Sequence, residues 1–179
     1  MLQVGKSAPP FDMPSTKDMK QLKENVNLDD YKGKWLIMFF YPLDFTFVCP
    51  TELKAFNDRI DDFKKAGAEI LAVSTDSVYS HRAWINTPDD KGGLGEIKYV
   101  LASDITKDVS RDYGVLLEDK GIALRGLFII DPDGNLQYQV VHSLNIGRSV
   151  DETLRVLEAL KTGGLCQADW KPGQKPLAV

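Results

Sequence analysis

An uninterrupted run of seven apolar residues, Trp35 to Tyr41, restricts the folding of this chain more than any other feature. Pro42 follows directly and ends the run. A segment of that length without a polar position predicts a strand buried on both faces, as in a sheet covered by helices. The run is far shorter than the roughly 20 residues that a membrane-spanning helix needs. It is also the longest apolar run in the sequence, so we do not expect a membrane protein or a membrane partner.

Periodic segments follow the loop from Pro42 to Val48. Residues Ile70 to Val73 predict a second strand, Val78 to Ile85 a helix, and Tyr99 to Leu101 a further short strand. This alternation predicts βαβ units and a sheet with parallel strands. Before the second strand, apolar residues at helical spacing predict one amphipathic helix that continues to Gly67: Leu53, Phe56, Ile60 and Phe63.

A hairpin is predicted in the second half of the chain, after a helical turn at Val109 to Tyr113. Apolar runs at Leu124 to Ile130 and Leu136 to Val141 flank Asp131-Pro132-Asp133-Gly134. Proline and glycine around an aspartate are typical of a tight turn. The two runs are therefore expected to pair as antiparallel strands.

The last predicted helix begins at Ser149 with a capping box, in which Ser149 caps the helix and Glu152 reaches back to it. Gly163-Gly164 ends the helix, and the tail that follows is expected to be loose and mobile. The buried stripe of the helix consists of four apolar residues: Val150, Leu154, Leu157 and Leu160.

Two parallel βα units, a hairpin and a closing helix are the element order of an α/β thioredoxin-like fold. Residues 1–34 are polar and broken by prolines, so they predict an extended N-terminal arm without regular elements. We expect one domain over residues 1–161 and an extended C-terminal tail over residues 162–179. A chain of 179 residues that is 43% apolar can bury a sizeable core.

The composition excludes several classes of protein. The chain has 22 basic and 26 acidic residues without long runs of one sign, which argues against a nucleic-acid-binding face. Met1 to Lys6 lacks the pattern of a secretory signal, so a cytoplasmic location is expected. Two cysteines are too few for a disulfide scaffold. The possible zinc ligands are scattered, so we expect no metal site: Cys49, Cys166, His81 and His142.

Cys49 lies in the first turn of a predicted helix, directly after a loop that leaves a buried strand. Free N–H groups and the positive end of the helix dipole favour an anion there, and the thiolate is the nucleophilic form of cysteine. An unreactive alternative is that Cys49 is a small buried hydrophobe, as most free cysteines are. Neighbouring residues favour the reactive interpretation. Thr46 offers a hydroxyl to a bound oxygen, while Pro42 and Pro50 shield the thiol from water.

The segment Tyr41 to Glu52 contains the pattern Pro-x-x-x-Thr-x-x-Cys and resembles the signature of the peroxiredoxins. The similarity is greatest to the typical two-cysteine subgroup, which includes the bacterial alkyl hydroperoxide reductase peroxidase subunit. Four further segments in the same order extend the resemblance over most of the chain, which makes it far more specific than one short motif. They are Ser74 to Asp76, Gly92 to Gly95, Leu124 to Ile130 and Gly147 to Thr153.

The resemblance implies that Cys49 is the peroxidatic cysteine, with Pro42, Thr46 and Arg125 completing the active site. When a thiolate attacks a peroxide, negative charge grows on the departing oxygen, and fixed donors must meet that charge. Arg125 supplies several donors and a charge that favours the thiolate. As an alternative, Arg125 is an ordinary solvated charge, although its place at the start of an apolar strand calls for a buried partner.

Glu52 and Arg148 each leave two interpretations open. Glu52 either favours the helix N-terminus through its charge or holds an arginine. In similar proteins the arginine that matches Arg148 lies near the active site, but a role at the start of the last helix fits the sequence equally well. His81 and Trp84 are expected to be packing or subunit-contact residues.

Cys166 is the only other cysteine, and its setting resembles the resolving-cysteine segment of the same subgroup, with Gln167 where many relatives have proline. A bystander thiol on a frayed tail is the alternative. The residues alone do not say whether Cys166 reaches Cys49 in its own chain. The resemblance implies that it comes from the partner in a homodimer, after local unwinding of the helix that carries Cys49. Such dimers often assemble into rings of five.

The resemblance thus implies a thiol-dependent peroxidase that reduces hydrogen peroxide and organic hydroperoxides. No nicotinamide, flavin or haem motif is present, so we expect no cofactor and an external electron donor, either thioredoxin or a flavoprotein disulfide reductase. A thiol-disulfide oxidoreductase is disfavoured because Cys49 is not part of a Cys-x-x-Cys motif. A redox-controlled holdase chaperone is the alternative from a different functional class.

Overall fold

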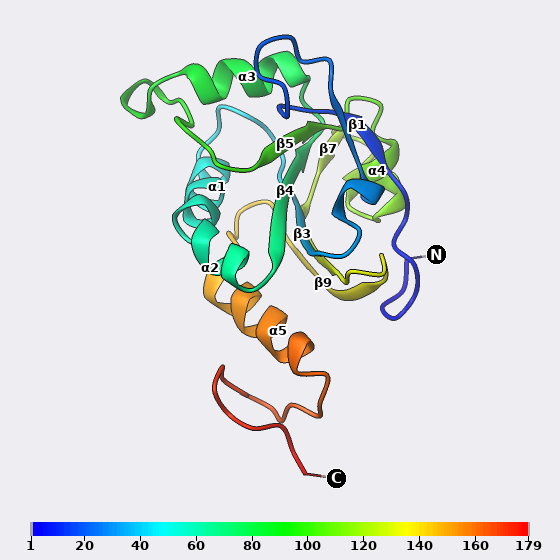
Figure 1. Ribbon diagram of the computed structural model, residues 1–179. Helices are drawn as coiled ribbons and strands as arrows, with labels where there is room; N and C mark the ends of the chain where they lie inside the picture. The colour runs from blue at the N-terminus through cyan, green and yellow to red at the C-terminus, as the bar shows by residue number, and fades with distance from the viewer. Residues whose placement is uncertain (1, 179) are drawn as a thin grey trace.

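A five-stranded mixed sheet forms the centre of the computed structural model, which describes residues 2–178 (Figure 1). Strand β3 is parallel to β4, and β4 to β5, whereas β8 is antiparallel to both β3 and β9. The predicted order of two parallel βα units, a hairpin and a closing helix is therefore confirmed. Across the sheet the strands are β5 (Val100–Ser103), β4 (Ala68–Ser74), β3 (Trp35–Phe40), β8 (Arg125–Ile130) and β9 (Leu136–His142).

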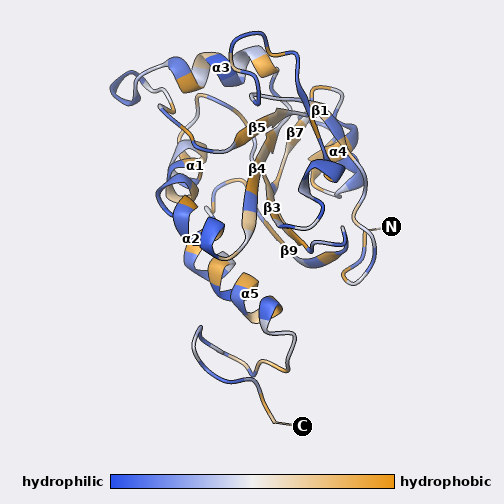
Figure 2. Cartoon of the chain, viewed as in Figure 1, coloured by the Kyte–Doolittle hydropathy of each residue, from blue (hydrophilic) through white to orange (hydrophobic). Residues whose placement is uncertain are grey.

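The apolar run of β3 has partners on both faces of the sheet. Ile37 and Phe39 belong to a core cluster that includes apolar residues of the helices on one face. Leu36, Met38 and Phe40 belong to a second cluster that includes residues of the N-terminal arm. Figure 2 shows the central strands as the most hydrophobic part of the chain. Burial on both faces explains why this strand has no polar position.

The helices surround this sheet. The helix predicted to continue to Gly67 is divided into two by Arg59, whose backbone (φ −103°, ψ 13°) is not helical. The Arg59 side chain binds Asp62 and Asp151, and such ion pairs leave no mark on the apolar periodicity. Within residues 2–178, no helix is both long enough and apolar enough to cross a bilayer. The helices are α1 (Val48–Asp58), α2 (Ile60–Lys65), α3 (Val78–Asn86), α4 (Asp108–Asp112) and α5 (Val150–Thr162).

Only half of the capping box predicted at the start of α5 forms. The Ser149 hydroxyl accepts the N–H of Glu152 at 3.1 Å, as predicted. The Glu152 carboxylate, however, binds the guanidinium of Arg155 instead of reaching back to the cap. Gly163 ends the helix in the left-handed conformation (φ 64°), which glycine adopts without a steric penalty.

The N-terminal arm contains regular elements that were not expected there. Strands β1 (Asp12–Pro14) and β2 (Asn25–Asn27) pair antiparallel, and the short 3-10 helix η1 (Leu28–Tyr31) follows. Met13 and Val26 are buried against the sheet, so packing stabilises these short strands despite the prolines nearby. Three further short elements were not predicted: η2 (Asp89–Lys91), β6 (Leu116–Leu117) and β7 (Ile122–Ala123).

The C-terminal tail, expected to be loose, folds back on itself beyond α5 (Figure 1). The Leu177 N–H donates to the Leu165 carbonyl at 2.9 Å. Trp170 is only 2% exposed, and its carbonyl accepts a hydrogen bond from Arg155. A buried tryptophan therefore anchors this segment to the last helix.

Candidate active site

Cys49 is the second residue of α1, as predicted, and its side chain is only 1% exposed. The loop that leaves β3 brings it to the carboxyl end of the sheet's central strand. Phe47 precedes the helix and has no side-chain cap bond, so the N–H groups of the first turn are left for another acceptor. The position favours an anion at Cys49.

Arg125, at the start of β8, contacts this sulfur directly. Its Nη1 donates to Cys49 Sγ at 3.5 Å and to Glu52 Oε2 at 2.6 Å. Its Nε donates to the Leu144 carbonyl at 2.7 Å, which fixes the plane of the guanidinium. Arg125 is buried, so the solvated alternative left open by the sequence is wrong.

Glu52, one turn after Cys49, lies between two buried guanidinium groups. Arg148 donates to it from Nε (2.8 Å, to Oε1) and Nη2 (2.9 Å, to Oε2), as does the Arg148 backbone N–H (2.8 Å). Burial alone would raise the pKa of Glu52, but the hydrogen bonds and charge of Arg148, and then the charge of Arg125, lower it overall. Of the two interpretations of Glu52, the structure therefore supports the holding of arginine.

Arg148 is fixed from both sides, because its Nη1 also donates to the carbonyls of Phe40 (2.8 Å) and Gly126 (2.6 Å). Burial lowers the pKa of Arg148, and the bonds to Glu52 oppose that shift. Arg148 therefore belongs to the site rather than to the surface of α5. Two guanidinium charges against one carboxylate leave one excess positive charge beside Cys49, which a thiolate would neutralise.

Thr46 and Pro42 lie in the loop that leads to Cys49. Thr46 Oγ1 donates to the Leu43 carbonyl at 2.8 Å, so its one hydroxyl proton is already used. The lone pairs of this oxygen remain available to a bound molecule. Pro42 is buried, in keeping with the predicted shielding role.

A buried polar network beneath this loop was not found from the sequence. Asp44 Oδ1 accepts the Tyr41 hydroxyl at 2.7 Å, and Asp44 Oδ2 lies 2.8 Å from Nδ1 of His81. Burial, and then the charge of Asp44, raise the pKa of Tyr41. His81 is thus a hydrogen-bonding partner of the loop rather than a simple packing residue. Its partners Asp44, Tyr41 and Ala102 lie 37, 40 and 21 positions away in sequence, so no local pattern indicates them.

Cys166 lies apart from this cluster, at the carboxyl end of α5. Its half-buried side chain faces a groove of about 510 Å³ between α5, Tyr138 of β9 and the tail. Both cysteines are free thiols. The structure therefore brings Arg125, Glu52 and Arg148 together at Cys49, whereas Cys166 lies at the other end of α5.

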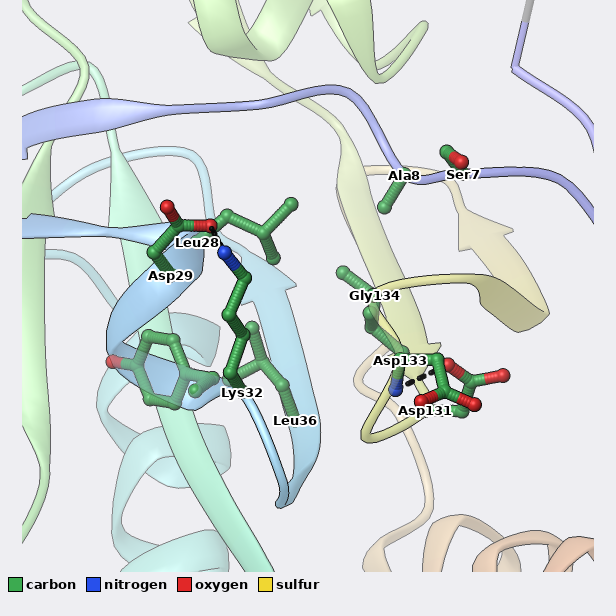
Figure 3. A pocket seen from close by; sticks show the side chains of 11 residues that line it. Ser7, Ala8, Leu28, Asp29, Lys32, Leu36, Asp131, Asp133 and Gly134 are labelled. Carbon is green, nitrogen blue, oxygen red and sulfur yellow. Dashed lines mark hydrogen bonds and ion pairs between the residues drawn. The ribbon is translucent and has the colours of Figure 1, made fainter.

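A smaller cavity, of about 180 Å³, lies between the N-terminal arm, the start of β3 and the turn after β8 (Figure 3). It is lined by Leu36 near the start of β3 and by Ile130 at the end of β8. The ion pair of Lys32 and Asp29 forms part of its wall. The cavity has no cysteine in its lining, and it shares no residue with the cluster around Cys49.

Comparison with known proteins places this cluster in a family context. The AhpC/TSA family matches residues 4–139. The chain is 55% identical over 179 residues to the chloroplastic 2-Cys peroxiredoxin BAS1 of Hordeum vulgare, with coverage of 97% of this chain and 84% of the relative. It is 53% identical over 175 residues to peroxiredoxin-2 of Mus musculus, with coverage of 96% and 87%.

A solved structure agrees with these similarities. The reduced 2-Cys peroxiredoxin of Plasmodium vivax superimposes with a TM-score of 0.91 at 44% identity, with coverage of 96% of this chain and 91% of that one. This likeness also confirms the predicted thioredoxin-like fold, which peroxiredoxins share. With a buried cysteine at a helix N-terminus and an arginine on its sulfur, the chain belongs to the AhpC/TSA family and is a peroxiredoxin, a thiol-dependent peroxidase.

Proposed function

We propose that Cys49 is the residue that reduces the peroxide, and that the 3.5 Å contact of Arg125 with its sulfur carries this assignment. The Cys49 thiolate attacks one peroxide oxygen, so an S–O bond forms while the O–O bond breaks. The second oxygen leaves as water or an alcohol after taking a proton. Cys49 becomes a sulfenic acid and is oxidised by two electrons, and the peroxide is reduced by two.

Arg125 and Thr46 have separate roles in this step: Arg125 stabilises the negative charge that develops on the leaving oxygen, and Thr46 orients the hydroperoxide. Arg125 is held in one plane by Glu52 and the Leu144 carbonyl, so its donors are already oriented when charge develops on the leaving oxygen. Thr46 contributes a lone pair that accepts the hydrogen of a bound hydroperoxide and holds it in line. Hydrogen peroxide and small organic hydroperoxides both carry the O–OH group that these contacts recognise.

Cys166 of a partner subunit completes the cycle in this proposal. Cys166 Sγ contacts the Ala159 carbonyl, and Ala159 is ten residues after Ser149, or roughly 15 Å along the helix. Arg148, just before Ser149, is the residue bound to Glu52 near Cys49. A disulfide needs Cα atoms within roughly 7 Å, so exchange of tails in a two-fold dimer is favoured. Because Cys49 is buried, the start of α1 unwinds for the sulfurs to meet.

The surface offers two features that fit self-association. Strand β9 is at the edge of the sheet and, within residues 2–178, has one side without a strand neighbour. Large apolar side chains are exposed around the Cys49 loop and the start of α3, and the most exposed, Phe47, is 92% accessible. They are Leu43, Phe45, Phe47 and Tyr79. The first feature supports a dimer, and the second supports assembly of dimers into rings of five.

The cycle ends with both cysteines oxidised in a disulfide, so an external dithiol is required to reduce them back to thiols. Thioredoxin or a flavoprotein disulfide reductase has the chemistry to supply it. Turnover of peroxide in the presence of each candidate donor distinguishes the two.

Peroxide consumption and non-reducing electrophoresis test these assignments together. The reduced protein should consume peroxide rapidly, Cys49→Ser should consume none, and Cys166→Ser should stop after one equivalent unless an added thiol replaces the lost partner. Oxidised protein should migrate as a disulfide-linked dimer, and a band of monomer alone would refute the intersubunit bond. Suppression of aggregation without peroxide consumption, unchanged by Cys49→Ser, would instead support the holdase chaperone.

A further inference from the structure

The thiol of Cys166 is held at the carboxyl end of α5 by two oxygen atoms. Its Sγ lies 3.4 Å from the Thr162 hydroxyl oxygen and 3.7 Å from the Ala159 carbonyl oxygen. The Thr162 hydroxyl is itself 2.8 Å from the Ala159 carbonyl, and the Gly164 N–H donates to it at 3.1 Å. All four groups therefore belong to one small hydrogen-bonded cluster at the helix end.

The direction of these hydrogen bonds follows from the number of protons available. A carbonyl oxygen can only accept, so the one hydroxyl proton of Thr162 is given to Ala159. Because the 2.8 Å bond to Ala159 uses the Thr162 proton, both Thr162 and Ala159 present lone pairs towards Cys166, and in this arrangement the sulfur is the donor. The last carbonyls of a helix also carry the negative end of its dipole. This geometry accommodates the S–H form of Cys166 and opposes its thiolate, the reverse of the environment of Cys49.

We propose that Thr162 is a positioning residue that holds Cys166 as a thiol on α5, so that release of this contact sets the rate of disulfide formation. The inference rests on the proposed function of Cys166. In that step the Cys166 thiol gives up its proton, an S–S bond forms and the S–O bond of the Cys49 sulfenic acid breaks. The hydroxide that leaves takes the proton and becomes water. The sulfenic acid is the oxidant, so no further reagent is needed.

The rest of the tail reinforces this hold. Trp170 is buried, and the Arg155 guanidinium on α5 donates to its carbonyl at 3.0 Å. The backbone bond from Leu177 to Leu165 closes the loop on the other side of Cys166. Release of Cys166 from Thr162 is therefore the local part of a larger movement of the tail away from α5.

Alkylation of Cys166 in the Cys49→Ser background tests the hold without any peroxide chemistry. Thr162→Val removes the hydroxyl and keeps the shape, so iodoacetamide should label Cys166 roughly threefold to tenfold faster, the factor expected for one lost hydrogen bond. Thr162→Ser keeps the hydroxyl and should restore the slow rate. Thr87→Val is the matched control, because Thr87 makes the same bond to Ala83 at the end of α3. Thr87→Val should leave labelling unchanged.

A second measurement follows disulfide formation after one equivalent of peroxide, with Cys49 intact. Thr162→Val should form the disulfide faster by a similar factor, whereas Thr87→Val should not. Equal labelling rates in Thr162→Val and Thr162→Ser would show that the Thr162 hydroxyl does not hold Cys166 on α5. Faster labelling without faster disulfide formation would show that release of this contact does not set the rate of disulfide formation. If the wild-type protein consumes no peroxide, the proposed function fails, while the alkylation result still stands on its own.

Discussion

Glu52 shows at the scale of a single residue how buried charge organises this site. Its carboxylate accepts hydrogen bonds from both Arg125 and Arg148, and all three side chains are almost entirely inaccessible. Removing one partner from a buried ion pair leaves an uncompensated charge, which is far more destabilising than the loss of a surface pair. The same carboxylate therefore controls both the orientation of Arg125 and the stability of the fold.

Glu52→Gln should lower the free energy of unfolding by about 3–5 kcal/mol near neutral pH. Because the pKa of Glu52 is lowered in the folded protein, the Glu52 carboxylate stabilises the fold fully at any pH above its pKa in the unfolded chain, about 4.3. This stabilisation is lost as the pH falls through the lower folded value. Urea unfolding from neutral to strongly acid pH should therefore show the gap between wild type and variant narrowing only in acid.

Glu69→Gln is the control for this comparison. Glu69 pairs with Lys34 on the surface, where both side chains are well exposed. Its loss should change stability by less than about 1 kcal/mol. A gap between wild type and Glu52→Gln that stays constant from neutral to acid pH would contradict the assigned charge.

Helix α5 connects the two halves of the proposed reaction at the scale of an element. Its first turn follows directly on Arg148, which binds Glu52, and its last turn holds Cys166. The cap at Ser149 therefore fixes where α5 begins. The length of this helix then separates Cys166 from the cluster around Cys49 within one chain. The C-terminal glycine then directs the chain into the tail.

Ser149→Ala should lower the free energy of unfolding by about 1 kcal/mol, because the Glu152 N–H loses its acceptor. Denaturant unfolding monitored by circular dichroism measures this change. Ser143→Ala, at an exposed position in the preceding loop, serves as the comparison and should have an effect within about 0.5 kcal/mol. Equal effects of the two substitutions would show that the cap contributes nothing.

At the scale of the whole molecule, exposed apolar side chains around the Cys49 loop indicate a surface for assembly. Tyr79 is 66% exposed on α3, and its neighbour Ser80 donates to Asp44 of the loop. A hydrogen bond thus connects the exposed surface at the start of α3 to the loop that leads to Cys49. Assembly and the conformation of the active-site loop are expected to influence each other.

Tyr79→Asp should reduce the mass of the largest assembly and leave dimers, because a charge in an apolar contact loses its hydration without a partner. Sedimentation velocity of the reduced protein measures the distribution. Val4→Asp is the control, since Val4 is an exposed apolar residue of the N-terminal arm. If Tyr79→Asp assembles as the wild type does, this surface is not the interface between dimers.

Elements with strong local signals were predicted correctly from the sequence. The β3 run, the turn between β8 and β9, and the cap and terminal glycine of α5 each depend on residues within a few positions of one another. The break at Arg59 and the pairing of β1 with β2 were missed. Arg59 pairs with Asp151, 92 positions away, and the residues of β1 and β2 are buried against the sheet, so neither feature has a local signal.

The sequence by itself determined the order of strands and helices and the position of Cys49 in a first helical turn, because apolar periodicity and turn chemistry act over short distances. Only the tertiary structure decided that Glu52 lies between Arg125 and Arg148, which are 73 and 96 positions away. Only the tertiary structure shows how the tail folds back on α5, with Cys166 a helix length from the cluster around Cys49. A buried charge pairs with the opposite charge that packing places next to it, and that packing depends on contacts between segments remote in sequence.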